Sequence, residues 1–222
     1  ADIAGGSHHA VMSILAAVIA RGATQKGQWL DVSMTDAAFS LNALFGAGAL
    51  VSGESPQLSG TMLNGGCFYD YYQTQDGRYL SVGGLEPKFA QQFFIILEQP
   101  SWFELSMNPK PKIQQQLRND IAKIIAQKSL SLWQQVFANS DVCLEPVLTV
   151  TEAANSTLMQ QRNMVVEVPL AEKTIKQIAP AVKMSQQRVS NTAAPSTGKH
   201  SHEILMALGY CEEAILNITK KV

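Results

Sequence analysis

The sequence predicts an α/β protein, of α+β type within the 222 residues of this chain. Three observations carry this prediction. Two apolar helical patterns flank a short alternating segment at the start, a β-hairpin pattern and several helices follow, and two short helices close the chain. Hydrophobic residues make up 46% of the chain and charged residues 16%, which is enough apolar surface for a folded core.

The start of the chain has the pattern of a helix, a strand and a second helix. Ser7 is a suitable cap for a helix over residues 8–21, and Gly22 is a suitable left-handed stop after it. Apolar and polar residues alternate over residues 28–34, which predicts a strand, and Thr35 is a suitable cap for the helix that follows. One strand between two apolar helices has no sheet to join, so we expect missing sequence on the N-terminal side.

The centre of the chain begins with a glycine-rich stretch, residues 52–66, whose four glycines, three serines and one proline indicate a linker or a long binding loop. A hairpin is expected from two strands joined at Gln75-Asp76-Gly77. Pro87 suits the first turn of a helix that ends near residue 98. Strands are expected over residues 68–74, 78–82, 144–150, 165–168 and 175–182, and further helices over residues 110–128, 129–139, 201–208 and 211–218.

Local signals mark the ends of several of these elements. Ser129 is expected to cap the helix that follows it, and Thr151 to open a helical turn. A loose segment is expected over residues 190–198, and Gly209 is expected to end the helix before it.

Charge and cysteine content exclude several functional classes. The net charge of -1 argues against nucleic acid or an anionic membrane as the main partner. Cys67, Cys143 and Cys211 form no Cys-x-x-Cys pair, so we expect no metal site, no disulfide framework and a reducing compartment. The apolar stretch over residues 11–20 is shorter than the roughly 20 residues that span a bilayer, and no basic region of a secretory signal precedes it.

The segment Asp2-Ile3-Ala4-Gly5-Gly6-Ser7 has a chemical logic of its own. Gly5 and Gly6 would let a ligand approach the backbone, and the helix after them would offer free N–H groups to a developing negative oxygen. Asp2 would then transfer a proton or attack a carbonyl carbon. The alternative is that Asp2 is an incidental residue beside a glycine turn, because carboxylates mark sites only probabilistically.

Several motifs occur together in one order along the chain. ADIAGGS is followed by ILAAVIAR and TQKGQWLDVSMTDA, then by TMLNGGCFYDYYQTQDGRYLSVGGLEPKF, NSDVCLEPVLTVTEA and GKHSHEILMALGY. This series resembles CoA-transferase family III (CaiB/BaiF), and its third part resembles the α-methylacyl-CoA racemase branch of that family. The resemblance covers nearly the whole chain and implies the family III CoA-transferase fold.

The resemblance implies a racemase or epimerase that interconverts (R)- and (S)-2-methylacyl-CoA thioesters through an enolate, by 1,1-proton transfer. The family aspartate that precedes the glycine pair matches Asp2, and the glutamate of the Glu-Pro motif, which orients a catalytic histidine, matches Glu86. The family histidine lies upstream of the aspartate. We therefore expect this chain to be a C-terminal portion without that histidine, inactive by itself although its parent is an enzyme.

The same resemblance implies the substrate contacts. CoA is part of the substrate, so no separate cofactor is expected. Residues matched to the substrate site are Gly5, Gly6, Met34, Leu63, Gly65, Tyr69 and Leu85. One departure puts the pocket shape in question: relatives carry Ala-Pro after the glycine pair, whereas this chain has only Cys67 before Phe68. His8, His9, His200 and His202 are not expected to replace the missing histidine.

Two alternatives stay open. In a family III CoA-transferase, the same Asp2 would be a nucleophile that forms an acyl anhydride. Transferases of this family carry a glycine-rich loop before the hairpin and lack the Glu-Pro motif, whereas this chain has only Gly65-Gly66 there and does have Glu86-Pro87, which favours the racemase. The second alternative is an inert structural or dimerisation fragment.

The resemblance also implies an organisation and an assembly. Residues 1–51 would be part of a large domain, 52–67 a linker, 68–190 a complete small α+β domain, and 191–222 a helical tail that returns to the large domain. Relatives form interlocked homodimers, so we expect one here. The chain ends in Lys-Lys-Val rather than in a peroxisomal tripeptide, and we expect a cytoplasmic location for a bacterial protein and a mitochondrial or peroxisomal one for a eukaryotic protein.

Overall fold

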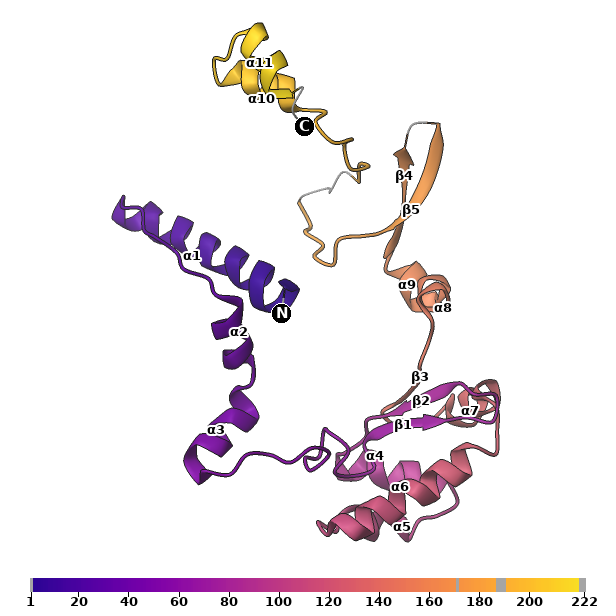
Figure 1. Ribbon diagram of the computed structural model, residues 1–222. Helices are drawn as coiled ribbons and strands as arrows, with labels where there is room; N and C mark the ends of the chain where they lie inside the picture. Colours follow the sequence, from indigo (N-terminus) through magenta and orange to yellow (C-terminus); the bar gives the residue numbers. More distant parts are fainter. Residues whose placement is uncertain (1, 171, 187–190, 220–222) are drawn as a thin grey trace. The chain divides into compact units, whose positions relative to one another are not determined.

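A computed structural model describes residues 2–170, 172–186 and 191–219 of the chain (Figure 1). The described residues form two compact units, Ala1–Val147 and Leu148–Val222. Both units combine helices with antiparallel strands, which confirms the predicted α/β class. The expected division at residues 51, 67 and 190 stays a prediction.

A three-stranded antiparallel sheet lies at the centre of the first unit. Strand β1 (Asp70–Gln73) pairs with β2 (Tyr79–Val82), and β2 pairs with β3 (Leu144–Pro146). The turn between β1 and β2 depends on Gly77, whose φ of 73° is unfavourable for other residues, and the Thr74 N–H donates to the Arg78 carbonyl at 2.8 Å. The predicted hairpin is confirmed, with shorter strands than the sequence indicated.

Four helices pack with this sheet around one core. They are α4 (Pro87–Ile96), α5 (Trp102–Ser106), α6 (Pro111–Ile125) and α7 (Leu130–Phe137). Figure 1 shows α4, α5 and α6 grouped beside strands β1 and β2. The buried residues of the core are Phe68, Tyr72, Leu80, Val82, Ala90, Phe93, Phe94, Leu97, Leu117, Ile121, Ile125, Leu130, Trp133 and Phe137.

Side-chain hydrogen bonds fix the ends of the core helices. The Ser129 hydroxyl accepts from the Leu132 N–H, which confirms the predicted cap of α7. The Asp76 carboxylate accepts from the Leu130 N–H at 3.1 Å and so ties the hairpin turn to the same helix. Helix α5 was not predicted from the sequence. The carbonyl groups at its end accept hydrogen bonds from the buried Gln114 side-chain amide, which donates to those of Leu105, Ser106 and Asn108.

The N-terminal stretch is helical from its first described residue. A π-helical segment, η1 (Asp2–His8), runs directly into α1 (His9–Thr24). Two predictions are therefore wrong. Ser7 lies inside this continuous helix and does not cap its start, and Gln25, with φ of 58°, takes the left-handed position expected at Gly22. The helix continues past Gly22 and ends at Thr24, where Gln25 takes the C-cap position.

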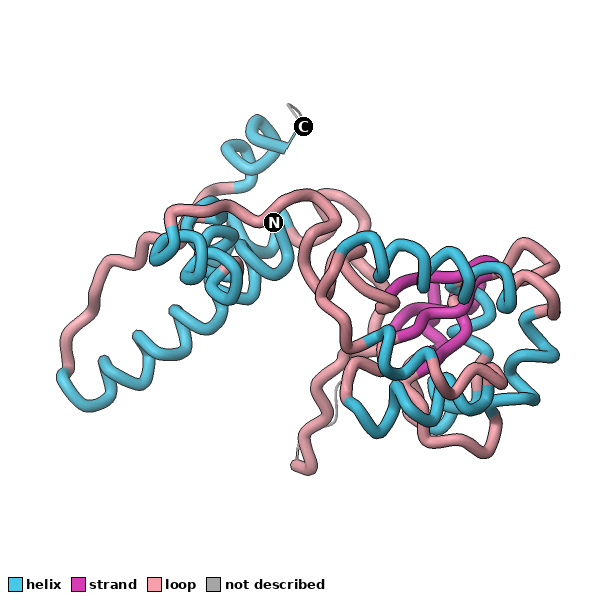
Figure 2. Tube along the Cα trace, turned by 90° about the horizontal axis from the view of Figure 1, so that it is seen from below, coloured by secondary structure: helices cyan, strands magenta, loops and turns pink. Residues whose placement is uncertain are grey.

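No strand forms over residues 28–34, which are loop up to Ser33 (Figure 2). A strand needs a partner for its backbone N–H and C=O groups, and this segment pairs with none of the described strands. The second predicted helix is also divided, into α2 (Met34–Leu41) and α3 (Ala43–Ser52), which meet at an angle of 76°. Ser33 caps α2 by accepting from the Asp36 N–H, so the predicted Thr35 cap is wrong.

The second unit holds short helices and one hairpin. Its elements are α8 (Val150–Asn155), α9 (Thr157–Gln161), β4 (Val165–Leu170), β5 (Lys173–Ile178), α10 (Ser201–Ala207) and α11 (Glu212–Thr219). Thr149 rather than Thr151 starts α8, because Thr149 and Glu152 form a reciprocal capping box. Gly209, with φ of 86°, follows α10 as predicted. Ser190, at the start of the expected loose segment, lies outside the described residues, and residues 191–198 contain no helix or strand.

One described helical stretch, Asp2–Thr24, is long and apolar enough to cross a membrane by length and composition. This differs from the shorter apolar stretch noted in the sequence because η1 and α1 are continuous. A single such helix is weak evidence, since core helices of other proteins pass the same test. The expected absence of a membrane partner stays a prediction.

The core makes a direct prediction about stability. Replacing Ile121, which is fully buried on α6, by alanine removes apolar contacts and leaves a cavity, so Ile121→Ala should lower the free energy of unfolding by about 2–5 kcal/mol. Ile95→Ala on α4 is the control, because that side chain is 49% exposed. Urea unfolding of both variants measures the difference, and equal losses would contradict this core.

A second prediction concerns pH. The Thr74 hydroxyl and then the Leu130 N–H donate to Asp76 and lower the pKa of its carboxyl. A carboxyl with a lowered pKa stabilises the fold above its ordinary pKa of about 3.9, and this contribution is lost as the pH falls through the folded-state pKa.

Asp76→Asn should therefore have a lower free energy of unfolding than the unmodified chain at pH 7. The difference between the two free energies should become smaller below about pH 4. Urea unfolding at several pH values measures it. Asp141→Asn is the control, because Asp141 is exposed and makes no hydrogen bond to the described residues. A gap that stays constant down to acid pH would contradict the role of Asp76.

Candidate active site

Asp2 lies at the first position of the π-helical segment η1, with an exposed side chain. Its carboxylate makes no hydrogen bond or ion pair with the described residues. Two bonds hold the backbone around it: the Ser7 hydroxyl donates to the Asp2 carbonyl at 3.3 Å, and His9 Nδ1 lies 2.6 Å from the Ala4 carbonyl. Because a carbonyl only accepts, Nδ1 carries the proton in this bond. Short π-helical segments occur frequently at functional sites.

Gly5 and Gly6 lie against α2 rather than in an open glycine loop. A Cβ on Gly5 would lie 3.4 Å from the Met34 carbonyl oxygen and 3.7 Å from the Ala37 Cβ. A Cβ on Gly6 would lie 3.4 Å from the Met34 side chain. Three of the predicted site residues therefore meet here, where η1 packs on α2. Substrate binding by these glycines stays a prediction.

A hollow of about 250 Å³ lies beside this contact, between α1 and α2. Six of its eight lining residues are of polar type, and the full set is His9, Ser13, Asp31, Val32, Ser33, Asp36, Ala37 and Ser40. From the sequence, His9 was expected only not to replace the missing histidine. In the structure its ring borders this hollow and bonds to the Ala4 carbonyl, two residues after Asp2. A histidine five residues after a helical carbonyl is a weak signal by itself, because only the π-helical geometry brings the two together.

Glu86 is positioned by the start of α4. It is the residue before Pro87, which occupies the first helical turn, and its backbone carbonyl accepts from the N–H groups of Phe89 and Ala90. Its side chain makes no capping bond and is exposed. The start of helix α4 thus fixes the backbone of Glu86 and leaves its carboxylate available for another partner.

Leu85 and Tyr69 lie next to the same strand end. Leu85 is half-buried and packs against the hydrophobic core. Tyr69 packs over Gly83, since a Cβ on that glycine would lie 3.5 Å from the tyrosine ring. The Gly83 N–H donates to the Cys143 carbonyl at 2.7 Å, which anchors the segment that leads to Glu86.

The remaining predicted residues, Leu63 and Gly65, belong to a tight turn over residues 61–66. Leu63 is 51% exposed, and Gly65 has a positive φ of 74°. The predicted residues therefore form two local groups. One joins Asp2 with the glycine pair and Met34, and the other contains this turn, Tyr69, Leu85 and Glu86.

Over residues 2–170, 172–186 and 191–219, no three His, Cys, Asp or Glu side chains are arranged to hold a metal ion. Burial raises the pKa of the Cys67 thiol, and that thiol donates to the Met62 carbonyl, so it is a poor ligand or nucleophile.

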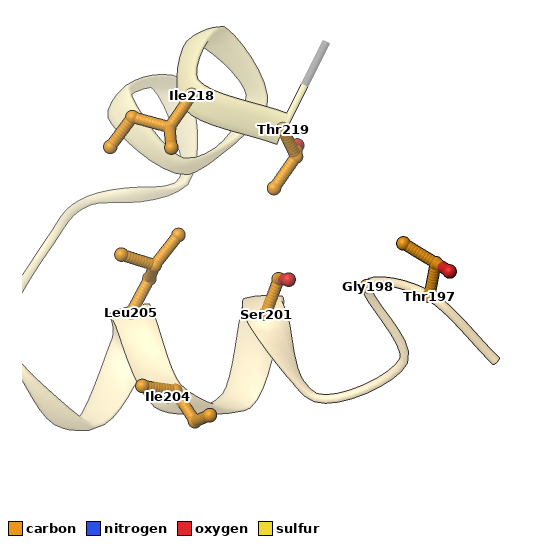
Figure 3. Close-up of a pocket in the computed structure, with 7 residues that line it drawn as sticks. All are labelled: Thr197, Gly198, Ser201, Ile204, Leu205, Ile218 and Thr219. Carbon is orange, nitrogen blue, oxygen red and sulfur yellow. The ribbon is translucent and has the colours of Figure 1, made fainter. Parts of the chain in front are cut away.

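A larger hollow, of about 660 Å³, lies in the second unit between α10 and α11 (Figure 3). Leu205 and Ser201 face Ile218 and Thr219 across it. Its lining has hydroxyl groups but no acid, base or thiol, so it lacks groups for proton transfer. It contains none of the predicted site residues.

Comparison with known proteins places these features in a family. The family description "CoA-transferase family III" matches residues 1–201. The chain is 29% identical to the α-methylacyl-CoA racemase of Homo sapiens over 225 residues, which is 98% of this chain and 57% of that protein. It is 28% identical to an acyl-CoA transferase of Fusarium pseudograminearum over 214 residues, 91% of this chain and 46% of that protein. The chain thus spans about half the length of these relatives.

A solved structure shows the same fold. The CAIB/BAIF family protein of Brucella suis superposes with a TM-score of 0.72 at 19% identity, and the match covers 93% of this chain and 55% of that one. The match of the family description over residues 1–201 decides the assignment. The chain belongs to CoA-transferase family III.

Proposed function

We propose that the protein containing this chain is a racemase of 2-methylacyl-CoA thioesters, with Asp2 as one of its two acid–base groups. The observation that carries the proposal is that the carboxylates of Asp2 and Glu86 are exposed and pair with no described residue, while the backbone of each is fixed by neighbouring elements. The name of the relative from Homo sapiens supports the substrate class. An interlocked homodimer is part of the same proposal and follows from the family resemblance.

The proposed chemistry is a proton transfer at the α-carbon. The Asp2 carboxylate takes the α-proton on one face, the C–H electron pair forms the C=C bond of the enolate, and the thioester oxygen gains the negative charge. A second acid returns a proton on the opposite face, and the carbonyl is restored. In the reverse direction, protonated Asp2 gives the proton back. The family resemblance implies a histidine as the second group and matches none of the histidines of this chain to it.

Glu86 has a different proposed role. A carboxylate beside an imidazole fixes its orientation and favours its protonated form. The position of Glu86 before Pro87, with no partner for its side chain among the described residues, suits this function.

A CoA-transferase is the second candidate, and the acyl-CoA transferase name of the Fusarium pseudograminearum relative favours it. Here the Asp2 carboxylate attacks the thioester carbonyl and CoA thiolate leaves, giving an acyl aspartyl anhydride. The thiolate then attacks the aspartyl carbonyl and releases the acyl carboxylate, and an acceptor carboxylate receives CoA in two matching steps. An exposed carboxylate at Asp2 suits both mechanisms, so the products must distinguish them.

The two candidates make different predictions for one experiment. The complete polypeptide is incubated in D2O with one epimer of 2-methyldecanoyl-CoA and free butyrate, and the α-hydrogen is followed by NMR. A racemase exchanges the α-hydrogen and forms both epimers without butyryl-CoA. Butyryl-CoA without α-exchange would overturn the racemase proposal in favour of the transferase.

Asp2→Asn should lower the exchange rate by about 10²- to 10⁴-fold, the usual contribution of a general acid–base group. Glu104→Gln is the control, because Glu104 is an exposed carboxylate on α5, outside both groups of site residues. Retained exchange in folded Asp2→Asn would remove Asp2 from the mechanism.

Glu86→Gln tests the positioning role. Removing the carboxylate should lower the pKa of the neighbouring base and move the corresponding limb of the kcat/KM pH profile to lower pH. A reduced rate with an unchanged pH profile would mean that Glu86 supports the fold rather than the base.

A further inference from the structure

Arg118, on helix α6, connects two segments that are distant in the sequence. Its Nη1 donates to the Gly65 carbonyl at 2.7 Å, and its Nη2 pairs with the Asp70 carboxylate. The two side chains are only 23% and 29% exposed. Hydrogen bonds from an ionised donor are shorter and stronger than neutral ones, and partial burial reduces screening by salt.

Its two terminal nitrogens hold the guanidinium. The Nε–H is buried and has no hydrogen-bond partner among the residues that the structure describes. Asp70 is in turn oriented, because its other oxygen accepts from the Tyr71 N–H at 2.8 Å at the start of β1. The pair is therefore a fixed link between α6, β1 and the Gly65 carbonyl.

The turn over residues 61–66 has little freedom of its own. The N–H groups of Asn64 and Gly66 both donate to the Thr61 carbonyl, at 3.0 and 2.9 Å. A Cβ on Gly66 would lie 2.6 Å from that same oxygen, so only glycine fits. A turn this tight moves as one piece, and Arg118 ties it to α6 through Gly65.

Cys67 lies directly behind the turn and is 6% exposed. Its thiol donates to the Met62 carbonyl at 3.0 Å, and its sulfur accepts from the Tyr69 N–H at 3.5 Å. The Cys67 thiol is therefore shielded from solvent and reagents as long as the turn stays closed. The rate at which this thiol is labelled then measures how readily the turn opens.

The turn carries two of the residues matched to the substrate site, Leu63 and Gly65, and a third, Tyr69, lies two residues after Cys67. We propose that Arg118 and Asp70 are positioning residues for the acyl-binding side of the site: their ion pair clamps the turn and so fixes where Leu63 and Tyr69 meet the acyl chain. The substrate part of this inference rests on the proposed function, whereas the clamp itself rests on the contacts of Arg118 alone.

The clamp is tested on the 222-residue chain with Cys143 and Cys211, both exposed, replaced by serine, so that only Cys67 reacts with N-ethylmaleimide. Arg118→Met should speed the labelling of native Cys67 by at least about tenfold, as loss of a hydrogen bond to a charged group allows. Arg118→Lys should give a smaller increase, because lysine keeps the charge without the two-pronged geometry.

Lys123→Met is the matched control: Lys123 pairs with Asp120 on the same helix and is far more exposed. Thermal unfolding establishes that each variant is folded. If Arg118→Met does not fold, Asp70→Asn and Arg118→Lys answer the same question. Unchanged labelling in folded variants would overturn the clamp.

The substrate role is tested on the complete polypeptide by kinetics. Arg118→Lys should raise KM for 2-methylacyl-CoA and change the preference among acyl chain lengths, while the pH profile stays unchanged because Arg118 does not touch the reacting atoms. Faster labelling with unchanged KM and chain-length preference would overturn the positioning role and leave a structural clamp. Faster labelling without any α-exchange in the unsubstituted protein would instead overturn the proposed function.

Discussion

Burial of two adjacent aromatic residues on α4, Phe93 and Phe94, is the interaction on which the Glu86 side of the site depends. Their rings lie 5.2 Å apart, and Phe94 lies at the same distance from Phe68, which precedes β1. Both are at most 2% exposed. Aromatic pairs of this kind contribute about 0.5–1.5 kcal/mol beyond the burial of their area.

The packing of Phe93 and Phe94 also determines the position of Glu86. A helix rises about 1.5 Å per residue and transmits position along its axis. Because α4 begins at Pro87, the buried pair lies about two turns from Glu86 and fixes the position of that residue. Glu86 thus needs no bond of its own, and its carboxylate is left for a partner.

Asp2 is supported in a different way. Helices α1 and α3 bury none of their residues, so a large core does not hold η1. Its position depends on the contact of Gly5 with α2 and on the bond from His9 to Ala4. The acid–base group of the proposed reaction therefore rests on the local packing of η1 on α2.

The sequence predicted those features that depend on a few neighbouring residues. The hairpin at Gly77, the start of α4 at Pro87, the cap at Ser129 and the stop at Gly209 are all local, and all are confirmed. The strand over residues 28–34 was wrong because alternation alone does not supply a pairing partner.

Those residues of the candidate site that lie in a sequence motif were predictable, whereas those brought together by the fold were not. Asp2 and Glu86 were identified by motif resemblance, and their geometry suits the roles proposed for them. Arg118 and Asp70 are 48 residues apart, and no spacing rule joins them. On α6, Arg118 lies next to the buried Leu117, where a long charged side chain at the edge of an apolar stripe is ordinary.

The hydrogen bonds of the carboxylates distinguish Asp2 from Asp70 and Asp76 as the base of the proposed reaction. A carboxylate that removes a proton from carbon must reach the substrate with an unoccupied oxygen. Asp70 has both oxygens engaged, by Arg118 and by the Tyr71 N–H. Asp76 accepts from Thr74 and Leu130, which lower the pKa of its carboxyl and weaken it as a base. The Asp2 carboxylate makes no such bonds with the described residues, and the Ser7 hydroxyl bonds to its backbone carbonyl. Asp2 therefore combines an unoccupied carboxylate with a fixed backbone.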